Sequence, residues 1–167
     1  MKVVSKQKNS KMCIICGLDN PYGVKAQFYN MEDDSVMTVF KFHENHQSYP
    51  LRVHGGMIAA MLDELGLRAC WTKDENVWGV TMSLEAKYRK PVPYGEKLIA
   101  KGKVVKESER FLQTKAEIFD VKGNLLANAT VNYLKLQVSQ IAGSGVDEHE
   151  EMCYLIEDGV KEINFEQ

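Results

Sequence analysis

The sequence predicts an α+β fold in which one long central helix packs against a curved antiparallel sheet, in the order β-β-α-β-β-β-β. The helix is indicated by one long apolar segment, residues 57–71. Four strand-like segments follow it, and their short, turn-like connections favour antiparallel neighbours. Because the helix is apolar on nearly all sides, the sheet must wrap around it or a second subunit must complete its burial.

The individual elements follow from local patterns. Apolar and polar residues alternate over residues 24–31, which predicts a strand with one buried face. Asp33 and Asp34 form a turn, and residues 35–42 complete a hairpin. Only Asp63, Glu64 and Arg68 interrupt the apolar helix. Beyond it, we expect strands at residues 78–89, 97–106, 111–121 and 125–136.

The chain length of 167 residues favours a single domain. Residues 1–12 show no periodic pattern, so we expect them to be a disordered N-terminus. Residues 13–137 form the folded domain, and residues 138–167 form a C-terminal tail. Within this tail, residues 152–165 either form a short helix or stay mobile.

The composition argues against several classes of protein. Lys and Arg number 21 and Asp and Glu number 23, so neither nucleic acid nor a membrane surface is expected as a partner. No apolar run reaches the roughly 18 residues of a membrane-spanning helix. The polar, basic N-terminus does not resemble a secretory signal. Four cysteines are too few for a disulfide scaffold, so we expect a cytoplasmic protein.

Three segments carry a resemblance to a known family. HQSYPLRVHGGMIAAMLDELGLRACW and GVTMSLEAKYRKPVPYGEKLIAKGKVV resemble the helix signature and the following strands of hotdog-fold acyl-CoA thioesterases. CIICGLDNPYGVKAQFY is similar to an N-terminal element of one bacterial subgroup. The most similar branch contains phenylacetate-pathway thioesterases and mammalian thioesterase-superfamily members. The resemblance spans residues 13–136 and implies the hotdog fold and hydrolysis of an acyl-CoA.

His54, Gly55 and Gly56 stand where a loop enters the helix. Glycines let the backbone approach a ligand closely, and the amides of a first helical turn have no partner within the helix. These amides suit the developing oxyanion of a thioester. The alternative is a glycine turn needed only for the direction of the chain.

Asp63 lies inside the apolar helix, where an unpaired carboxylate is costly and needs a partner or a chemical role. In the families that the chain resembles, the acid nine residues after the histidine is the general base or nucleophile, and Asp63 has that offset. The alternative is an ion pair, which fits Glu64 better because Glu64 and Arg68 are four residues apart. Glu64 is kept as the second candidate for the catalytic carboxylate, because some hotdog branches use a glutamate one turn away.

Helix geometry separates the two parts of this candidate site. Nine residues place Asp63 about 180° around the helix from His54 and about 13 Å along its axis. One chain cannot easily bring both to one substrate, whereas a two-fold dimer can. The resembling families build their sites in this way, so we expect a homodimer; homotetramers are also common among them.

Other candidates depend more on the resemblance. Thr81 corresponds to a residue that can hold the attacking water, although threonine is also common in strands. Many relatives carry Asn where this chain has Ser48, so Gln47 or His46 is expected to orient the substrate carbonyl or the water instead. Arg89 and Lys90 are candidates for the phosphates of coenzyme A. For all of these, an ordinary surface role is the alternative.

Cys13 and Cys16 form a CxxC followed by glycine. A structural zinc site needs four ligands, and without a second CxxC it would have to recruit His43, His46 or a symmetry mate. No βαβ pattern follows that would favour a redox motif. We therefore expect a packed turn, with no metal and no cofactor apart from coenzyme A as part of the substrate. Cys70 is expected in the core.

The expected function is hydrolysis of an acyl-CoA thioester, with water activated by Asp63. One alternative is a non-catalytic module that binds acyl-CoA and does not hydrolyse it. Another is a hotdog hydratase or dehydratase, and the offset of Asp63 argues against it.

Overall fold

The computed structural model describes residues 1–142, 145–147 and 151–166. In this part of the chain, seven strands form one antiparallel sheet with the order β1-β2-β3-β5-β6-β7-β4. The strands are β1 (Val3–Lys6), β2 (Tyr29–Met31), β3 (Val36–Phe40), β4 (Gly79–Tyr88), β5 (Leu98–Glu107), β6 (Phe111–Asp120) and β7 (Leu125–Lys135). The helices are α1 (Gly55–Arg68), the short α2 (Val138–Ile141) and two 3-10 turns, η1 (Glu44–His46) and η2 (Cys70–Thr72).

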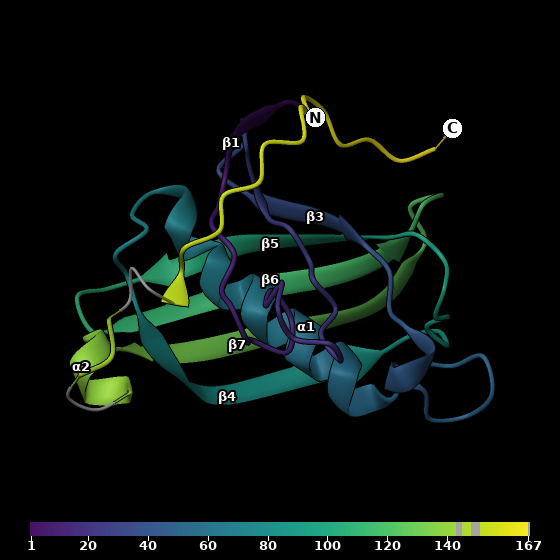
Figure 1. Cartoon of the computed structure of the whole chain (residues 1–167), viewed down its shortest axis with the longest axis horizontal. Coiled ribbons are helices and arrows are strands. Elements are labelled where there is room, and N and C mark those ends of the chain that lie inside the picture. Colours follow the sequence, from purple (N-terminus) through teal and green to yellow (C-terminus); the bar gives the residue numbers. More distant parts are fainter. Residues whose placement is uncertain (143–144, 148–150, 167) are drawn as a thin grey trace.

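The long helix α1 lies across one face of the sheet, and Figure 1 shows this arrangement. Its buried residues Ile58, Leu62 and Leu65 belong to one continuous core with the inward side chains of the strands. The predicted α+β fold, with a central helix against an antiparallel sheet, is therefore confirmed.

The strands after the helix begin and end within one or two residues of the predicted positions. In β6, every second residue from Leu112 to Ile118 is buried, namely Leu112, Thr114, Ala116 and Ile118. Alternation of this kind reports the two faces of a strand directly, which explains the accuracy of the prediction.

The hairpin before the helix is shorter than predicted. Only Tyr29–Met31 pairs with β3, although residues 24–31 alternate in polarity. Lys25 has a positive φ of 58°, and the amides of Val24 and Ala26 donate to Ile14 and Ile15 instead of a strand. Alternation here reflects packing of Ala26 and Phe28 into the core without strand pairing.

The expectation of a disordered N-terminus is wrong. β1 pairs with β2 at the sheet edge, and residues 7–16 pass over α1 on the side turned away from the sheet (Figure 1). Polar side chains hold this segment: Asn9, which is fully buried, donates to the carbonyls of Cys16 and Ala26. Hydrogen bonding of this kind leaves no apolar period in the sequence, so the prediction missed it.

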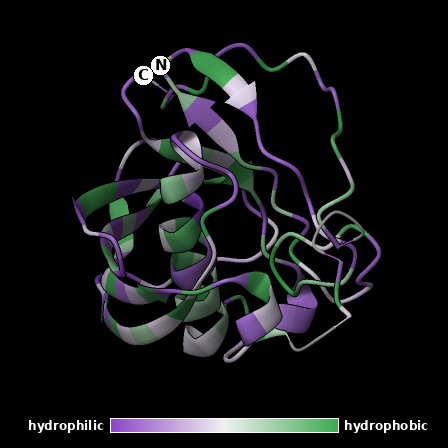
Figure 2. Cartoon of the chain, turned by 90° about the vertical axis from the view of Figure 1, so that its left-hand side faces the viewer, coloured by the Kyte–Doolittle hydropathy of each residue, from purple (hydrophilic) through white to green (hydrophobic). Residues whose placement is uncertain are grey.

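The expected helix or mobile segment at residues 152–165 is also not observed. Tyr154 pairs with Asn9 and Glu162 pairs with Lys2, so the tail runs extended beside the N-terminal segment. Ile163 is buried there. Figure 2 shows the two termini at one corner of the molecule. The tail contains one short helix, α2, and its residues 143–144, 148–150 and 167 lie outside the described part.

Over the described residues, none of the helices is both long and apolar enough to cross a membrane.

Candidate active site

Asp63 lies in the middle of α1 on the side that faces β4. The Thr81 hydroxyl, on β4, donates a hydrogen bond of 2.7 Å to Oδ1 of Asp63. Partial burial raises the pKa of Asp63 above its ordinary value, the hydrogen bond from Thr81 acts in the opposite direction, and the charge of Glu64 adds to the rise. The carboxyl group is thus held in place and made more basic than an exposed aspartate.

Tyr133, on β7, fixes the backbone at Asp63 from the side of α1 that faces the sheet. The buried Tyr133 hydroxyl donates a hydrogen bond of 2.6 Å to the Asp63 carbonyl oxygen. Gly66 makes this approach possible, because a Cβ at this position would overlap the Tyr133 hydroxyl. Sequence reasoning missed Tyr133, which has the appearance of an ordinary strand aromatic; only the register of β7 brings it under the helix.

The turn His54-Gly55-Gly56 forms the beginning of α1, as predicted. His54 is the N-cap, and its Nδ1 accepts a hydrogen bond of 2.9 Å from the Gly56 amide. The His54 carbonyl accepts from Met57 and Ile58. Within the described residues, the Gly55 amide has no acceptor. Of the first-turn amides expected to bind an oxyanion, Gly55 is therefore the one available, and the Gly56 amide is occupied by His54.

Strand β4 contacts the helix at two places. Thr81 reaches Asp63, and seven residues later the Tyr88 hydroxyl donates a hydrogen bond of 3.1 Å to the Gly55 carbonyl. Among the described residues of the single chain, no hydrogen bond or ion pair joins Asp63 to the turn at His54. Asp63 with Thr81 and the turn at His54 are therefore two separate places beside β4.

The edge of the sheet at β4 is open. β4 is the last strand of the sheet, and a bulge between Thr81 and Ser83 interrupts its pairing with β7. Two of its large apolar side chains are mostly exposed, Met82 at 59% and Tyr88 at 54%. Bulges at sheet edges often lie beside functional sites, where they redirect side chains.

The loop before the helix contains three further candidates. Gln47 pairs with Val53, and its Oε1 accepts a hydrogen bond of 2.9 Å from the Tyr94 hydroxyl. Ser48 is exposed, and its amide donates to the Arg52 carbonyl. These contacts fix the shape of the loop and leave the Gln47 side chain at the surface.

His46 has a structural role in place of the expected one. Its Nδ1 accepts from the His43 amide at 3.0 Å, so Nε2 carries the proton and donates to the Tyr22 carbonyl at 2.7 Å. The ring is buried. Both nitrogens are thus committed to backbone groups, and neither is available to orient a substrate.

Arg89 and Lys90 lie at the end of β4 near the helix N-terminus, directly after Tyr88. Arg89 Nε donates a hydrogen bond of 2.9 Å to Asn128 on β7, and the side chains of Arg89 and Lys90 are exposed. Cations at this place are accessible to an anionic group near the Gly55 amide.

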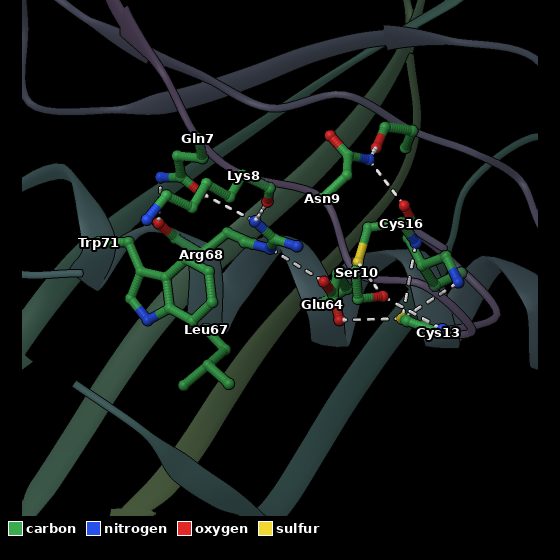
Figure 3. A network of polar contacts seen from close by, with 12 residues as sticks. Gln7, Lys8, Asn9, Ser10, Cys13, Cys16, Glu64, Leu67, Arg68 and Trp71 are labelled. Carbon is green, nitrogen blue, oxygen red and sulfur yellow. Dashed lines mark hydrogen bonds and ion pairs between the residues drawn. The ribbon is translucent and has the colours of Figure 1, made fainter. Parts of the chain in front are cut away.

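Glu64 faces a different side of α1, about 100° around the helix from Asp63. Its Oε1 lies 2.9 Å from Nε of Arg68, so the predicted ion pair is confirmed. Figure 3 shows the pair beneath the N-terminal segment, together with Cys13 and Cys16. Glu64 is therefore separated from Thr81 and from the open edge.

Comparisons with known proteins agree with this architecture. The family model of the thioesterase superfamily matches residues 52–127. A crystal structure of a thioesterase superfamily protein is similar over 74% of this chain and 63% of its own length, with 24% identity and a TM-score of 0.68. This chain thus spans less than two thirds of that protein. No protein of curated function matches the sequence.

Two other solved structures are similar at lower identity. Zebrafish thioesterase superfamily member 2 is 20% identical, with a TM-score of 0.60 over 66% of this chain and 80% of its own. A hypothetical thioesterase protein from Streptococcus pneumoniae, solved with coenzyme A, is 20% identical, with a TM-score of 0.60 over 67% of this chain and 89% of its own. At such identities the likeness establishes the fold alone. Residues 52–127 thus match the thioesterase-superfamily model, and the fold of the chain is the hotdog fold of these solved structures.

Proposed function

We propose that the chain hydrolyses an acyl-CoA thioester to a free acid and coenzyme A, with Asp63 as the catalytic carboxylate. The observation that carries the proposal is the half-buried Asp63, which has a raised pKa and is held by Thr81 in an otherwise apolar helix. A general base works best when its pKa lies near the working pH. Coenzyme A in the Streptococcus pneumoniae structure supports the choice of substrate class.

The proposed chemistry uses only side chains and backbone amides of the protein itself. Asp63 takes a proton from water while the water oxygen attacks the thioester carbon, and the negative charge moves to the carbonyl oxygen. The Gly55 amide donates a hydrogen bond to this oxyanion. When the intermediate collapses, the C–S bond breaks and the protonated Asp63 returns its proton to the thiolate of coenzyme A. Direct attack by Asp63, giving an anhydride that water then opens, is the alternative route.

We propose that the active site is shared between the two subunits of a homodimer. Two such dimers can form a tetramer, and the protein is proposed to act in the cytoplasm. Asp63 and Thr81 of one chain meet the turn at His54–Gly56 of its partner. The open edge of β4, with its exposed Met82 and Tyr88, supports this arrangement, because an exposed strand edge offers unpaired backbone groups to another chain. A two-fold axis makes the same contact twice and gives two sites.

Binding of the rest of the substrate is assigned to the surface around the helix N-terminus. Gln47, held by Tyr94, is placed to orient the carbonyl or the water, with Ser48 next to it in the loop. Arg89 and Lys90 bind the phosphates of coenzyme A, for which arginine offers bidentate contacts.

The test is a thiol-release assay on acyl-CoA substrates from acetyl to palmitoyl, with benzoyl and phenylacetyl included. We expect Asp63→Asn to lower kcat/KM by roughly 10²–10⁴-fold, as for removal of a general base. The exposed Asp34→Asn is the matched control, because asparagine accepts the positive φ of 60° at that turn. Wild-type turnover in Asp63→Asn would remove Asp63 from the mechanism. Tight coenzyme A binding without hydrolysis of any substrate would show a binding module instead.

A further inference from the structure

A cluster of three metal-ligating side chains lies on the side of α1 that faces the N-terminal segment. The sulfur atoms of Cys13 and Cys16 and a carboxylate oxygen of Glu64 all lie within 4.8 Å of one another. Cys13 Sγ is 3.7 Å from Glu64 Oε2. Two ligands of a tetrahedral zinc ion, one sulfur and one oxygen, are separated by roughly 3.5 Å when the usual bond lengths apply. The cluster thus already has nearly the dimensions of a zinc site.

The CIICG turn surrounds the sulfur of Cys13 with backbone hydrogen-bond donors, which stabilise a thiolate. The amides of Ile15 and Cys16 point at Cys13 Sγ, at 3.3 and 3.5 Å. The turn closes with a hydrogen bond from the Gly17 amide to the Cys13 carbonyl, and a Cβ on residue 17 would overlap that carbonyl oxygen. Hydrogen bonds to sulfur favour the charged form of a thiol, which is the form that binds a metal ion.

The charges around the cluster balance when a divalent cation replaces two protons. Arg68, which is 2% exposed, pairs with Glu64 Oε1 and leaves Oε2 directed at Cys13 (Figure 3). With both thiols protonated, Glu64 and Arg68 cancel. With both thiols ionised, the two additional negative charges equal the charge of a zinc ion.

A fourth coordination position is available to solvent. The three side chains line a cavity of about 240 Å³, whose other walls include Leu67, Trp71 and Met152. A metal ion and a water molecule can enter through it. Three protein ligands with one water are the arrangement of catalytic zinc sites, whereas purely structural sites use four protein ligands.

We propose that Cys13, Cys16 and Glu64 bind one zinc ion, with water from the cavity as the fourth ligand. The ion ties the N-terminal turn to α1 across 51 residues of sequence. Spacing alone argued for a packed turn without metal, because it offered only two cysteines; the structure supplies Glu64 as a third ligand from a different element. This site is separate from the proposed thioesterase site, so its test is independent of turnover.

The first experiment uses the wild-type protein and needs no variant. The metal-free chain is titrated with Co²⁺, and the absorption spectrum is recorded. We expect thiolate-to-cobalt charge-transfer bands and the intense visible bands of a tetrahedral ion, saturating at about one ion per chain and displaced by Zn²⁺. Alkylation mapped by mass spectrometry should show zinc protecting Cys13 and Cys16, while the exposed Cys153 stays reactive.

Variants then identify the ligands. Cys13→Ala, Cys16→Ala and Glu64→Gln should each lower the zinc content of purified protein, measured by elemental analysis, to below about a tenth of the wild-type value. Cys153→Ser is the matched control and should keep the zinc. The proposal is overturned if wild type takes up no cobalt through thiolates, if zinc leaves Cys13 and Cys16 unprotected, or if the zinc depends on Cys153.

Discussion

The two sides of α1 carry adjacent carboxylates with opposite surroundings. Asp63 faces the open edge at β4, where its polar side-chain contact is the Thr81 hydroxyl. Glu64 faces the N-terminal segment, where the buried Arg68 neutralises it. A rotation of about 100° per residue is enough to separate them. One helix thus places two neighbouring acids in different surroundings. We propose Asp63, bonded to Thr81, as the catalytic carboxylate, and Glu64 is held in an ion pair with Arg68.

The largest effect on the Asp63 side is expected from Gly55→Pro. Proline removes the free amide that we assign to the oxyanion, and it is tolerated at the first helical position. His54 already has an extended ψ of 136°, which suits a residue before proline. We expect kcat to fall by roughly 10²–10³-fold, as for other lost oxyanion donors, with an unchanged Tm. The measurement is steady-state thiol release beside thermal unfolding.

Gly55→Ala is the control for this change. Its Cβ would lie 3.6 Å from the Tyr88 ring, which is ordinary contact, and the amide is kept. It should retain most of the activity. Equal losses in the alanine and proline variants would point to crowding near Tyr88 and against a role for the amide.

On the other side of the helix, Glu64→Gln should lower stability. The substitution leaves the fully buried Arg68 without its countercharge, at a cost of roughly 2 kcal/mol, or a fall in Tm of about 4–8 °C. Measurement in the presence of a chelator separates this effect from loss of a metal ion.

The matched variant Asp63→Asn should change Tm in the opposite direction. Burial raises the pKa of Asp63 in the folded chain, so its ionised form opposes folding above that pKa. The neutral amide removes this penalty at neutral pH and gives no advantage at acid pH, where Asp63 is already protonated. A fall in Tm in both variants would contradict the contrast between the two sides.

A smaller effect is expected from Thr81→Val, which removes the hydroxyl bonded to Asp63. Loss of one charge-assisted hydrogen bond should lower kcat/KM by roughly tenfold. Because that bond lowers the pKa of Asp63, its removal raises the pKa further, and the acid limb of the pH–rate profile moves to higher pH. Thr81→Ser should restore both values. A lower rate with an unmoved acid limb would mean that Thr81 acts elsewhere.

Much of the fold could be predicted from the sequence because alternation and apolar helix length report burial directly. β6 illustrates this, because its strand range was predicted correctly and every second side chain from Leu112 to Ile118 is buried. The N-terminal segment could not be predicted, since polar Asn9 and Gln7 hold it by hydrogen bonds to distant carbonyls. Such contacts depend on the finished fold and leave no periodic pattern in the chain.

The candidate site was predicted where a residue type conflicts with its local pattern. Asp63 stands out in an apolar helix, and two glycines stand out at its beginning. Tyr133 and Tyr88 do not stand out, because aromatic residues are common in strands and only the strand register brings them to the helix. His46 was misread for the opposite reason: a histidine in a polar loop suggests a site, but both its nitrogens bond to the backbone.

The central claim is that one active site takes Asp63 from one chain and the Gly55 amide from another. Mixed dimers of Asp63→Asn and Gly55→Pro chains, isolated through two different affinity tags, test it directly. In a shared arrangement, one of the two sites in each mixed dimer contains neither change. We predict about half the wild-type thiol-release activity per dimer, although each parent is nearly inactive. Mixed dimers as inactive as their parents would contradict the shared site.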